Sequence, residues 1–468
     1  MLHLNFSKEE FGNANLGDKR LDNRLEKMAN AAMQNPRLGF PQMMETDAEL
    51  EATYRFFNNP RVTPEQILGS HFESSAQRCR EFQKIWVLHD TTIFKFGGEA
   101  HREGVGKVKG QAEGFQGHFS MAVLPEESRD TLGLLNVSLI NDTDRIGLRS
   151  PNERREASDR QSRRWEDGVA NAASIVGNKS HLVHVMDREC DSYLLWDWMV
   201  KNDHDFVIRV SWNRKVKTEI DVVKMFDLLA GRDGEPWVLE RSVRISKRGK
   251  PVGNPKYKKK HPARESRIVN LGIRAMAVSP KHNGYGGDAA SDHLNLNIVH
   301  VQELDTPEGE VPVEWHLMTT LPVDTPEQVA EVVDTYRGRW MIEEYFKALK
   351  TGCSFQKRQL ESYHALTLAM AVLAPVAWKM LRLKTLQREA PDLPATKVLT
   401  RTQLIILREI ARDPFPENPT VKDAFFAIAR KGGFLKHNKS PGWQTLGAGF
   451  ENLLIMESAW FLKERCDQ

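Results

Sequence analysis

The sequence predicts an α/β protein in which a mixed core of strands and helices is flanked by helical segments at both ends. Up to about residue 70, apolar residues such as Leu21, Leu25 and Met28 recur at helical spacing. From Ile85 the chain changes to short apolar runs that are rich in β-branched residues and bounded by turn residues, which is typical of strands. After about residue 370 the helical pattern returns.

The strand-like runs predict a mixed α/β domain that contains several short strands. They cover residues 85–96, 118–125, 131–140, 181–187 and 205–210. A second strand-rich region at about 216–315 contains many glycines and prolines and precedes a strongly helical segment at 326–352, which indicates a β insertion within the core. We therefore predict three domains, a helical one at 1–70, an α/β one at 71–370 and a helical one at 371–468.

Composition excludes several classes of protein. The start of the chain has no signal-peptide pattern, and we find no apolar run near the length of a membrane helix. We therefore expect a cytoplasmic protein that does not bind a membrane. The four cysteines form no CxxC pair, which predicts neither a zinc site nor a disulfide framework. The net charge of +3 on 468 residues does not by itself predict a polyanionic partner, so local clusters matter more.

Two aspartates stand in strand-like runs. Asp90 interrupts the apolar run 85–96, where an ionised carboxylate needs a cation or several hydrogen bonds. Asp187 closes the run 181–187 and opens a helical segment. Taken singly, each has an ordinary explanation, a turn at Asp90 and a helix cap at Asp187.

The helix predicted over 336–350 presents a more specific pattern. Tyr336, Arg339, Glu343 and Lys350 lie at offsets 0, 3, 7 and 14, which places them within a strip about 60° wide. Glu344 would point about 100° away. A solvated face with helix ion pairs remains the alternative. Two strand-borne aspartates and Glu343 would suit two Mg²⁺ or Mn²⁺ ions, because hard cations prefer carboxylate oxygens.

Two further features fit a nucleic-acid partner. The stretch 241–267 is rich in lysine and arginine, has a single acid, Glu265, and reads as a mobile loop for phosphate contacts, although it could be a merely solvated loop. Its candidate contacts are Lys247, Arg248, Lys258, Lys259 and Lys260. Trp315 could be an ordinary core aromatic or could stack a displaced base. His181 and His184 would point to opposite faces of a strand, which argues against joint metal ligation.

These residues match a known signature. The chain resembles bacterial insertion-sequence transposases of the DDE type, which carry the signature Y-x2-R-x3-E-x6-K, present here as Tyr336, Arg339, Glu343 and Lys350. The likeness spans essentially the whole chain. It includes LGDKRLDNRL at 16–25, YRFFNNP at 54–60, HDTT at 89–92, DRECDS at 187–192, FVIR at 206–209, SKRGKPVGNP at 246–255, EWHLMTT at 314–320, RWMIEEYFKALKTG at 339–352 and AIARKGGF at 427–434.

The resemblance implies a fold and a role for each matched residue. It implies an RNase H-like core whose metal-binding triad is Asp90, Asp187 and Glu343. The residues implied to contact DNA are Tyr336, Arg339, Lys350, Arg209 and, in an N-terminal end-recognition domain, Arg20, Arg24 and Arg55, with Trp315 receiving a flipped base. The chain departs from the family near the second aspartate, where it has Cys190 and Tyr193.

The resemblance also implies an activity. A family member nicks transposon ends, forms and opens a DNA hairpin, and joins the freed 3′-hydroxyl to target DNA, acting as a homodimer in the bacterial cytoplasm with two Mg²⁺ ions. The C-terminal domain would supply the dimer contacts. Two rivals remain open: a catalytically silent regulator that only occupies the ends, and an RNase H-like nuclease without end recognition.

Overall fold

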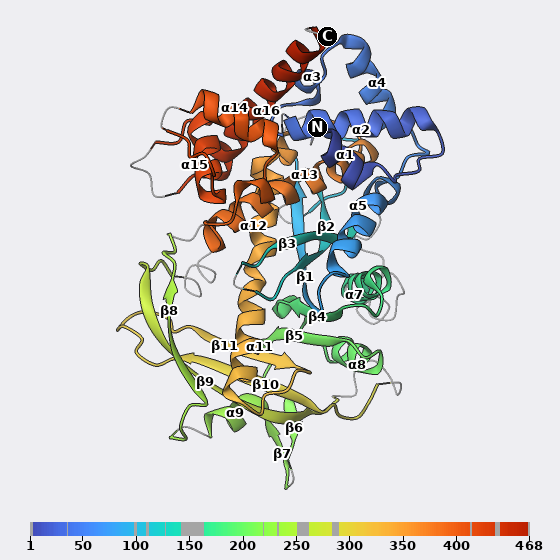
Figure 1. Ribbon diagram of the computed structural model, residues 1–468. Coiled ribbons are helices and arrows are strands. Elements are labelled where there is room, and N and C mark those ends of the chain that lie inside the picture. The colour runs from blue at the N-terminus through green and yellow to red at the C-terminus, as the bar shows by residue number, and fades with distance from the viewer. Residues whose placement is uncertain are drawn as a thin grey trace. The chain divides into compact units, whose positions relative to one another are not determined.

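The structure is a computed structural model, and it forms two compact units (Figure 1). It describes residues 3–34, 36–97, 101–108, 112–126, 128–141, 163–218, 220–231, 234–249, 262–282, 290–411, 414–435 and 440–466. The first unit comprises residues 1–150, 167–181 and 340–468, and the second comprises 151–166 and 182–339.

Three antiparallel strands form the sheet of the first unit, in the order β3-β2-β1. They are β1 (Lys84–Lys95), β2 (Gly114–Val123) and β3 (Thr131–Ile140). Most of their residues are buried, because apolar and β-branched side chains occupy both faces. The strands predicted at 85–96, 118–125 and 131–140 are confirmed, and Asp90 pairs with Phe119 in the middle of the sheet.

The helices of the first unit come from both ends of the chain. Those before the strands are α1 (His3–Phe11), α2 (Lys19–Gln34), α3 (Phe40–Met43), α4 (Asp47–Phe57) and α5 (Pro64–Cys79). Those after them are α7 (Arg163–Val176, mostly in this unit), α12 (Trp340–Lys347), α13 (Tyr363–Glu389), α14 (Arg401–Ile410), α15 (Val421–Lys431) and α16 (Trp443–Cys466). The helical character predicted for both ends is confirmed, whereas the predicted domain boundaries stay predictions.

The longest helix, α13, is the centre of the first unit. It packs against α2, α4, α5, α15 and strand β3. By length and composition its segment Tyr363–Arg388 could cross a membrane, so the expectation that no such apolar run exists was wrong for this segment. Most of its side chains are buried inside the protein, because they form the core between the N-terminal and C-terminal helices.

A buried polar network joins α1 and α5 to β3. The side chain of His71 contacts Glu10 (Nδ1 to Oε2, 2.5 Å), and its Nε2 accepts the backbone N–H of Leu134 at 3.1 Å. Arg78 donates to Glu10 at 2.8 Å and to the carbonyl of Leu132 at 2.6 Å. These contacts satisfy a glutamate and a histidine that are almost fully buried, and they tie the N-terminal helices to the sheet.

The second unit is built on a longer mixed sheet, in the order β4-β5-β11-β10-β9-β6-β7, with β8 paired to β9. Strands β4 and β5 pair in parallel, and the other strand pairs described in this unit are antiparallel. The strands are β4 (His181–Met186), β5 (Asp205–Val210), β6 (Lys215–Lys217), β7 (Val222–Lys224), β8 (Leu239–Ile245), β9 (Arg267–Pro280), β10 (Leu296–Glu303) and β11 (Glu314–Thr319). The strand content predicted for 216–315 is therefore confirmed, and these strands extend the sheet beyond β5.

Three α-helices accompany this sheet within the described residues of the second unit. They are α8 (Tyr193–Lys201), α9 (Met225–Ala230) and α11 (Pro326–Gly338). Helix α11 begins at a capping box, in which Thr325 accepts the N–H of Gln328 while the Gln328 side chain accepts the N–H of Thr325. It packs against β5, β8, β9, β10 and β11.

Candidate functional site

In the first unit, Asp90 and Lys350 are close enough for their charges to interact. Asp90 is half-buried on β1, where its carboxylate accepts the N–H of Thr91 at 2.8 Å. The ammonium of Lys350 lies 5.5 Å from the centre of the Phe94 ring on the same strand. Burial lowers the pKa of Lys350 to about 8, and the charge of Asp90 opposes that shift. A cation therefore accompanies the carboxylate that interrupts the apolar strand.

Glu343 and Glu344 are neighbours on α12, a helix that packs against β1. Glu344 is bound by Lys347 at 2.6 Å and by Lys384 of α13 at 3.1 Å. Although burial alone would raise it, these two lysines hold the pKa of Glu344 below its usual value. Glu344 thus links α12 to α13, and the role of Glu343 as the acid of the candidate site stays a prediction.

The prediction of one continuous α-helix over 336–350 was wrong. Helix α11 ends at Gly338, α12 begins at Trp340, and residues Ala348–Gly352 form a π-helical turn. Arg339 stands between the two helices with helical backbone angles (φ −53°, ψ −29°), so the interruption is local. A wider turn changes the angle per residue, and the strip calculated at 100° per residue therefore does not apply to Lys350.

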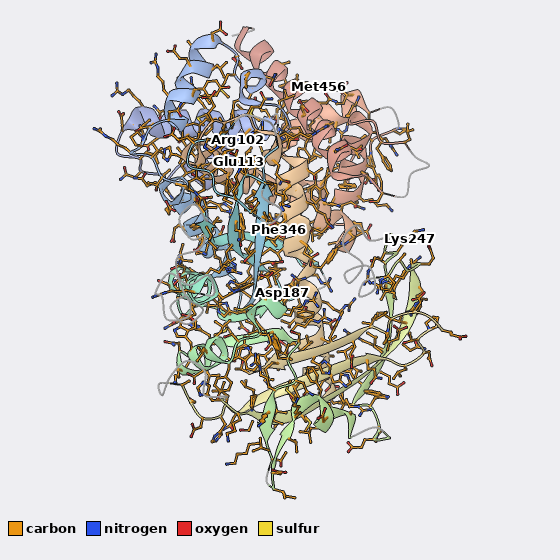
Figure 2. The ribbon with its side chains drawn as sticks, turned by 180° about the vertical axis from the view of Figure 1, so that it is seen from behind. Arg102, Glu113, Asp187, Lys247, Phe346 and Met456 are labelled. Carbon is orange, nitrogen blue, oxygen red and sulfur yellow. The ribbon has the colours of Figure 1, made fainter. Side chains whose placement is uncertain are left out.

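In the second unit, Asp187 follows β4 and caps a short 3₁₀ helix, Arg188–Cys190 (Figure 2). One of its carboxylate oxygens accepts the N–H of Glu189 at 2.8 Å. The thiol of Cys190 donates to the backbone carbonyl of Asp187 at 2.8 Å. The cap expected from the sequence is therefore present, and Cys190, one of the two departures from the family, supports it.

Tyr336 gathers several candidate DNA-binding residues around it. Its ring lies 5.5 Å from that of Trp315, edge to face. Burial raises the pKa of Tyr336, while the positive charges of Arg339 and Arg209 and a hydrogen bond with Arg209 act in the opposite direction. Arg209 also donates to the backbone carbonyl of Glu314 at 3.1 Å. The neighbouring charge of Asp187 acts on the same hydroxyl, so the second unit brings these five groups together.

The N-terminal arginines lie on helices of the first unit. Arg20 is exposed on α2 and binds Asp18 at 2.9 Å, and Arg55 is exposed on α4 and binds Glu51. Arg24 is half-buried on α2, and its Nη1 has no hydrogen-bond partner among the described residues. Surface ion pairs contribute little to stability, so Arg20 and Arg55 could exchange their local acids for DNA phosphates at a small cost in free energy.

The basic stretch 241–267 is only partly a loop, because its ends continue into β8 and β9. Arg248 and Arg264 form a backbone bridge beyond the two strands, and Lys247, just past the end of β8 (Figure 2), pairs with Glu265 at 2.8 Å. Arg241 is already bound to Asp334 of α11 at 2.8 Å. The expectation of a loop was therefore wrong for these ends, whereas Lys258, Lys259 and Lys260 lie outside the described residues.

Two segments of the chain match known protein families. Residues 3–62 match the family described as transposase DNA-binding, and residues 161–377 match the family described as transposase DDE domain. The chain carries the two domains of a DDE transposase. The DDE match contains Asp187, Tyr336, Arg339, Glu343 and Lys350, while Asp90 precedes it.

A solved structure is similar to this transposase over its whole length. It is the cryo-EM structure of the piggyBac transposase synaptic complex with hairpin DNA, which is 11% identical, with a TM-score of 0.39, over 100% of this chain and 82% of that one. The DDE domain carries an RNase H-like core, so the predicted fold class is confirmed by the family match and the mixed sheet. DNA as a partner and a DDE enzyme as the class of protein are likewise confirmed.

Two groups of polar residues were missed from the sequence. Asp191 accepts hydrogen bonds from the backbone of Ser211 and Trp212 and from Arg214, and so fixes the segment after β5. His300, Glu314 and His316 come together on β10 and β11. The second group has a weak sequence signal, because the E-x-H order of 314–316 places two ligand types on one face of a strand.

Proposed function

We propose that the protein is a cut-and-paste DNA transposase of the bacterial YREK group that resembles the Tn-five transposase. It would bind transposon ends, nick them, form and open a hairpin, and join the freed 3′-hydroxyl to target DNA. The observation that carries the proposal is the DDE match over 161–377, which contains all four signature residues and the second aspartate.

The donor chemistry of the proposed triad suits divalent metals. Asp90, Asp187 and Glu343 offer only carboxylate oxygens, which Mg²⁺ and Mn²⁺ prefer. One carboxylate oxygen of Asp187 accepts the hydrogen bond that caps the 3₁₀ helix. The second oxygen of the same carboxylate would bind the metal. Two such ions would lower the charge on the scissile phosphate and polarise the attacking and leaving oxygens.

The other residues would hold the DNA during these steps. Arg339 and Arg209 offer planar guanidinium groups for phosphate beside Tyr336, and Lys350 offers a point charge beside Asp90. Trp315, in contact with Tyr336, offers a ring on which a displaced base can stack. The N-terminal helices would read the transposon end, and two copies of the chain would pair two ends in the bacterial cytoplasm.

A matched pair of variants tests the proposal. Glu343→Gln should lose metal-dependent nicking, hairpin formation and strand transfer by about a thousandfold or more, as removal of a catalytic group does. Glu344→Gln changes the neighbouring carboxylate in the same way, yet it should keep activity, because Glu344 binds Lys347 and Lys384. The substrate is DNA carrying the inverted repeats that flank the gene, with Mg²⁺ or a chelator, and with Asp187→Asn alongside.

The products separate the rival functions. Hairpins and joined products that disappear in Glu343→Gln support a transposase. End binding without cleavage in any metal would make the protein a silent regulator. Cuts that ignore the end sequence and yield no joined product would make it a nuclease.

A further inference from the structure

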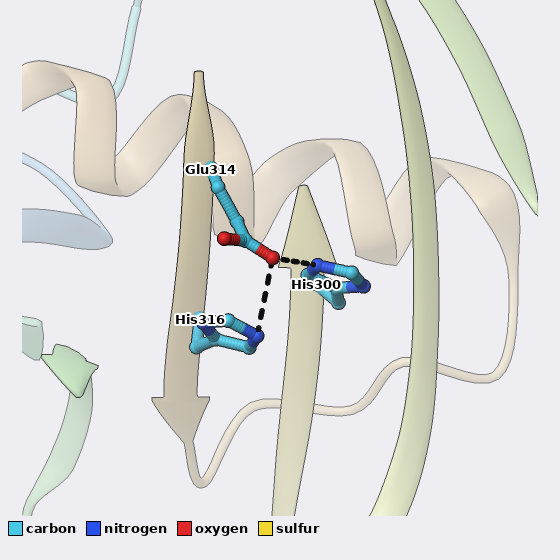
Figure 3. Close-up of side chains that lie close together, drawn as sticks. All are labelled: His300, Glu314 and His316. Atoms are coloured by element: carbon cyan, nitrogen blue, oxygen red, sulfur yellow. Dashed lines mark hydrogen bonds and ion pairs between the residues drawn. The ribbon is translucent and has the colours of Figure 1, made fainter. Parts of the chain in front are cut away.

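We propose a zinc-binding site on the second unit, formed by His300, Glu314 and His316, which clamps β10 to β11 (Figure 3). The site shares no residue with the carboxylate triad. The proposal depends on the positions of these three side chains and not on the proposed function. Its three side chains come from two neighbouring strands of one sheet.

Strand register brings the three residues to one face. His300 of β10 stands directly opposite His316 of β11 in the antiparallel pair. Glu314 precedes His316 by two residues, so both point to the same side of the sheet. The site therefore needs no loop to assemble, because regular backbone hydrogen bonds set the positions of all three residues.

The distances suit a single small ion. The Nε2 atom of His300 lies 3.0 Å from Oε1 of Glu314, and Nε2 of His316 lies 3.9 Å from the same oxygen. All three candidate ligand atoms lie within 4.8 Å of one another. Zinc bonds of about 2.0–2.1 Å in a tetrahedron place ligand atoms roughly 3.3 Å apart. The His300 and His316 rings are stacked with an angle of 5° between their planes, so zinc binding would require them to tilt until both Nε2 atoms point at one ion.

Aromatic neighbours hold the ring of His316 in place. It is stacked between the rings of Phe226, at 4.0 Å, and His300, at 4.6 Å. The side chain of Glu314 is 49% exposed, so an ion can enter from solvent.

The ligand set selects the kind of ion. Two imidazole nitrogens and one carboxylate oxygen suit Zn²⁺, whereas Mg²⁺ prefers oxygen ligands alone. The described thiols do not compete well, because Cys79, Cys190 and Cys353 are all buried, and burial raises the pKa of Cys79 and Cys353 to about 12. The same protein would thus hold zinc here while its carboxylate triad takes magnesium.

The clamp would act on the strand that carries Trp315. Trp315 lies between Glu314 and His316 and so points to the opposite face of β11, toward Tyr336. Arg209, whose partner in register is Leu317, lies on that same opposite face and donates to the Glu314 carbonyl. An ion bound by Glu314 and His316 would therefore fix the backbone on both sides of Trp315.

Metal binding to the full-length protein tests the site. Protein freed of metal by a chelator is titrated with Zn²⁺ in excess Mg²⁺ by calorimetry, and with Co²⁺ by absorption spectroscopy. One equivalent of Zn²⁺ should bind, Co²⁺ should give the intense visible bands of a four-coordinate site, and the melting temperature should rise with zinc. His316→Leu and Glu314→Gln should each lower the affinity at least tenfold, as loss of a ligand does.

Two controls keep the outcome decisive. His293→Gln removes an exposed histidine of the same unit and should leave zinc binding unchanged. His300→Gln tests the third ligand if His316→Leu folds poorly, which circular dichroism of the metal-free protein reports. Zinc that fails to bind at one equivalent, or that binds equally well to the wild type and to the His300 and Glu314 variants, would overturn the proposal.

Discussion

Trp315 packs against Tyr336 in the structure. Its ring meets that of Tyr336 edge to face at 5.5 Å, and the two rings lie beside Arg209. In the proposed function, a base extruded from the duplex during hairpin formation would stack on such an aromatic surface. The role of Trp315 follows from the proposed function and concerns one step of the reaction.

We expect Trp315→Ala to slow hairpin closure selectively. Stacking of one base is worth about 1–3 kcal/mol, which corresponds to roughly 5- to 150-fold in rate. Nicking of the first strand should change much less, because that step needs no extruded base. Single-turnover assays on pre-nicked and intact ends measure the two steps, and Trp315→Phe should restore most of the rate. Equal losses in both steps would assign Trp315 to packing.

The sequence predicted which secondary-structure element carries a residue better than it predicted which distant residues that residue contacts. The position of Asp90 on a buried strand followed from the apolar run around it, whereas the choice of Glu343 over Glu344 stays a prediction. The contact between Glu344 and Lys384 did not follow from the sequence, because Lys384 is 40 residues away along the chain. The group of His300 with Glu314 and His316 was missed because only the register of β10 with β11 brings it together.

The hairpin of β8 and β9 is an element with two kinds of basic residue. Lys247 and Arg248 lie beyond the end of β8, where Lys247 is largely exposed. Arg241 lies within β8 and forms a two-point contact with Asp334, with hydrogen bonds of 2.8 and 3.0 Å. The first kind is available to phosphate, and the second fixes the hairpin to α11.

Salt dependence should separate these two kinds. Lys247→Gln and Arg248→Gln should each lower the slope of log affinity against log salt for DNA by about 1. Arg241→Gln should leave that slope unchanged and instead lower the melting temperature. Filter binding or anisotropy between low and moderate salt measures the slopes. A slope that falls with Arg241→Gln as well would place that arginine on the DNA.

At the scale of elements, helix continuity was the weakest prediction. The segment 326–352 has a helical pattern throughout, yet the structure divides it at Arg339 and widens it at Ala348. Periodicity shows how apolar residues are spaced along the sequence. It does not show where a single residue, such as Arg339, departs from the α-helical hydrogen-bond pattern. Strand positions were predicted more closely, since β3 and β5 have the bounds that their apolar runs indicate.

The stability of the whole first unit depends on Glu10 and His71. Burial alone would raise the pKa of Glu10, but His71 and Arg78 hold it at about 2. Burial lowers the pKa of His71, and its Nε2 accepts a backbone N–H, which requires the neutral ring. Glu10 therefore stabilises the fold above about pH 4.5 and loses this contribution toward pH 2, while His71 makes folding less favourable as pH falls below 6.5.

We expect the free energy of unfolding to fall continuously from pH 6.5 toward acid. Glu10→Gln should cost about 3–5 kcal/mol at pH 7, because it leaves the buried side of Arg78 without its carboxylate, and it should flatten the pH dependence below 4.5. Glu9→Gln, at the exposed neighbouring position, should change little. Urea unfolding at several pH values measures both. A wild type that is equally stable at pH 7 and pH 4 would contradict this account.

Synthesis of the chain gives α13 a further importance. Its packing partners α2, α4, α5 and β3 leave the ribosome before it does, and α15 follows it, so a nascent full-length chain can bury the N-terminal side of this long apolar helix as soon as the helix emerges. A product that starts internally, beyond α2 and α4, would present part of the same surface to water. Such a shortened protein would be handled by chaperones and proteases, and its abundance in the cell would depend on how much of α13 another surface covers.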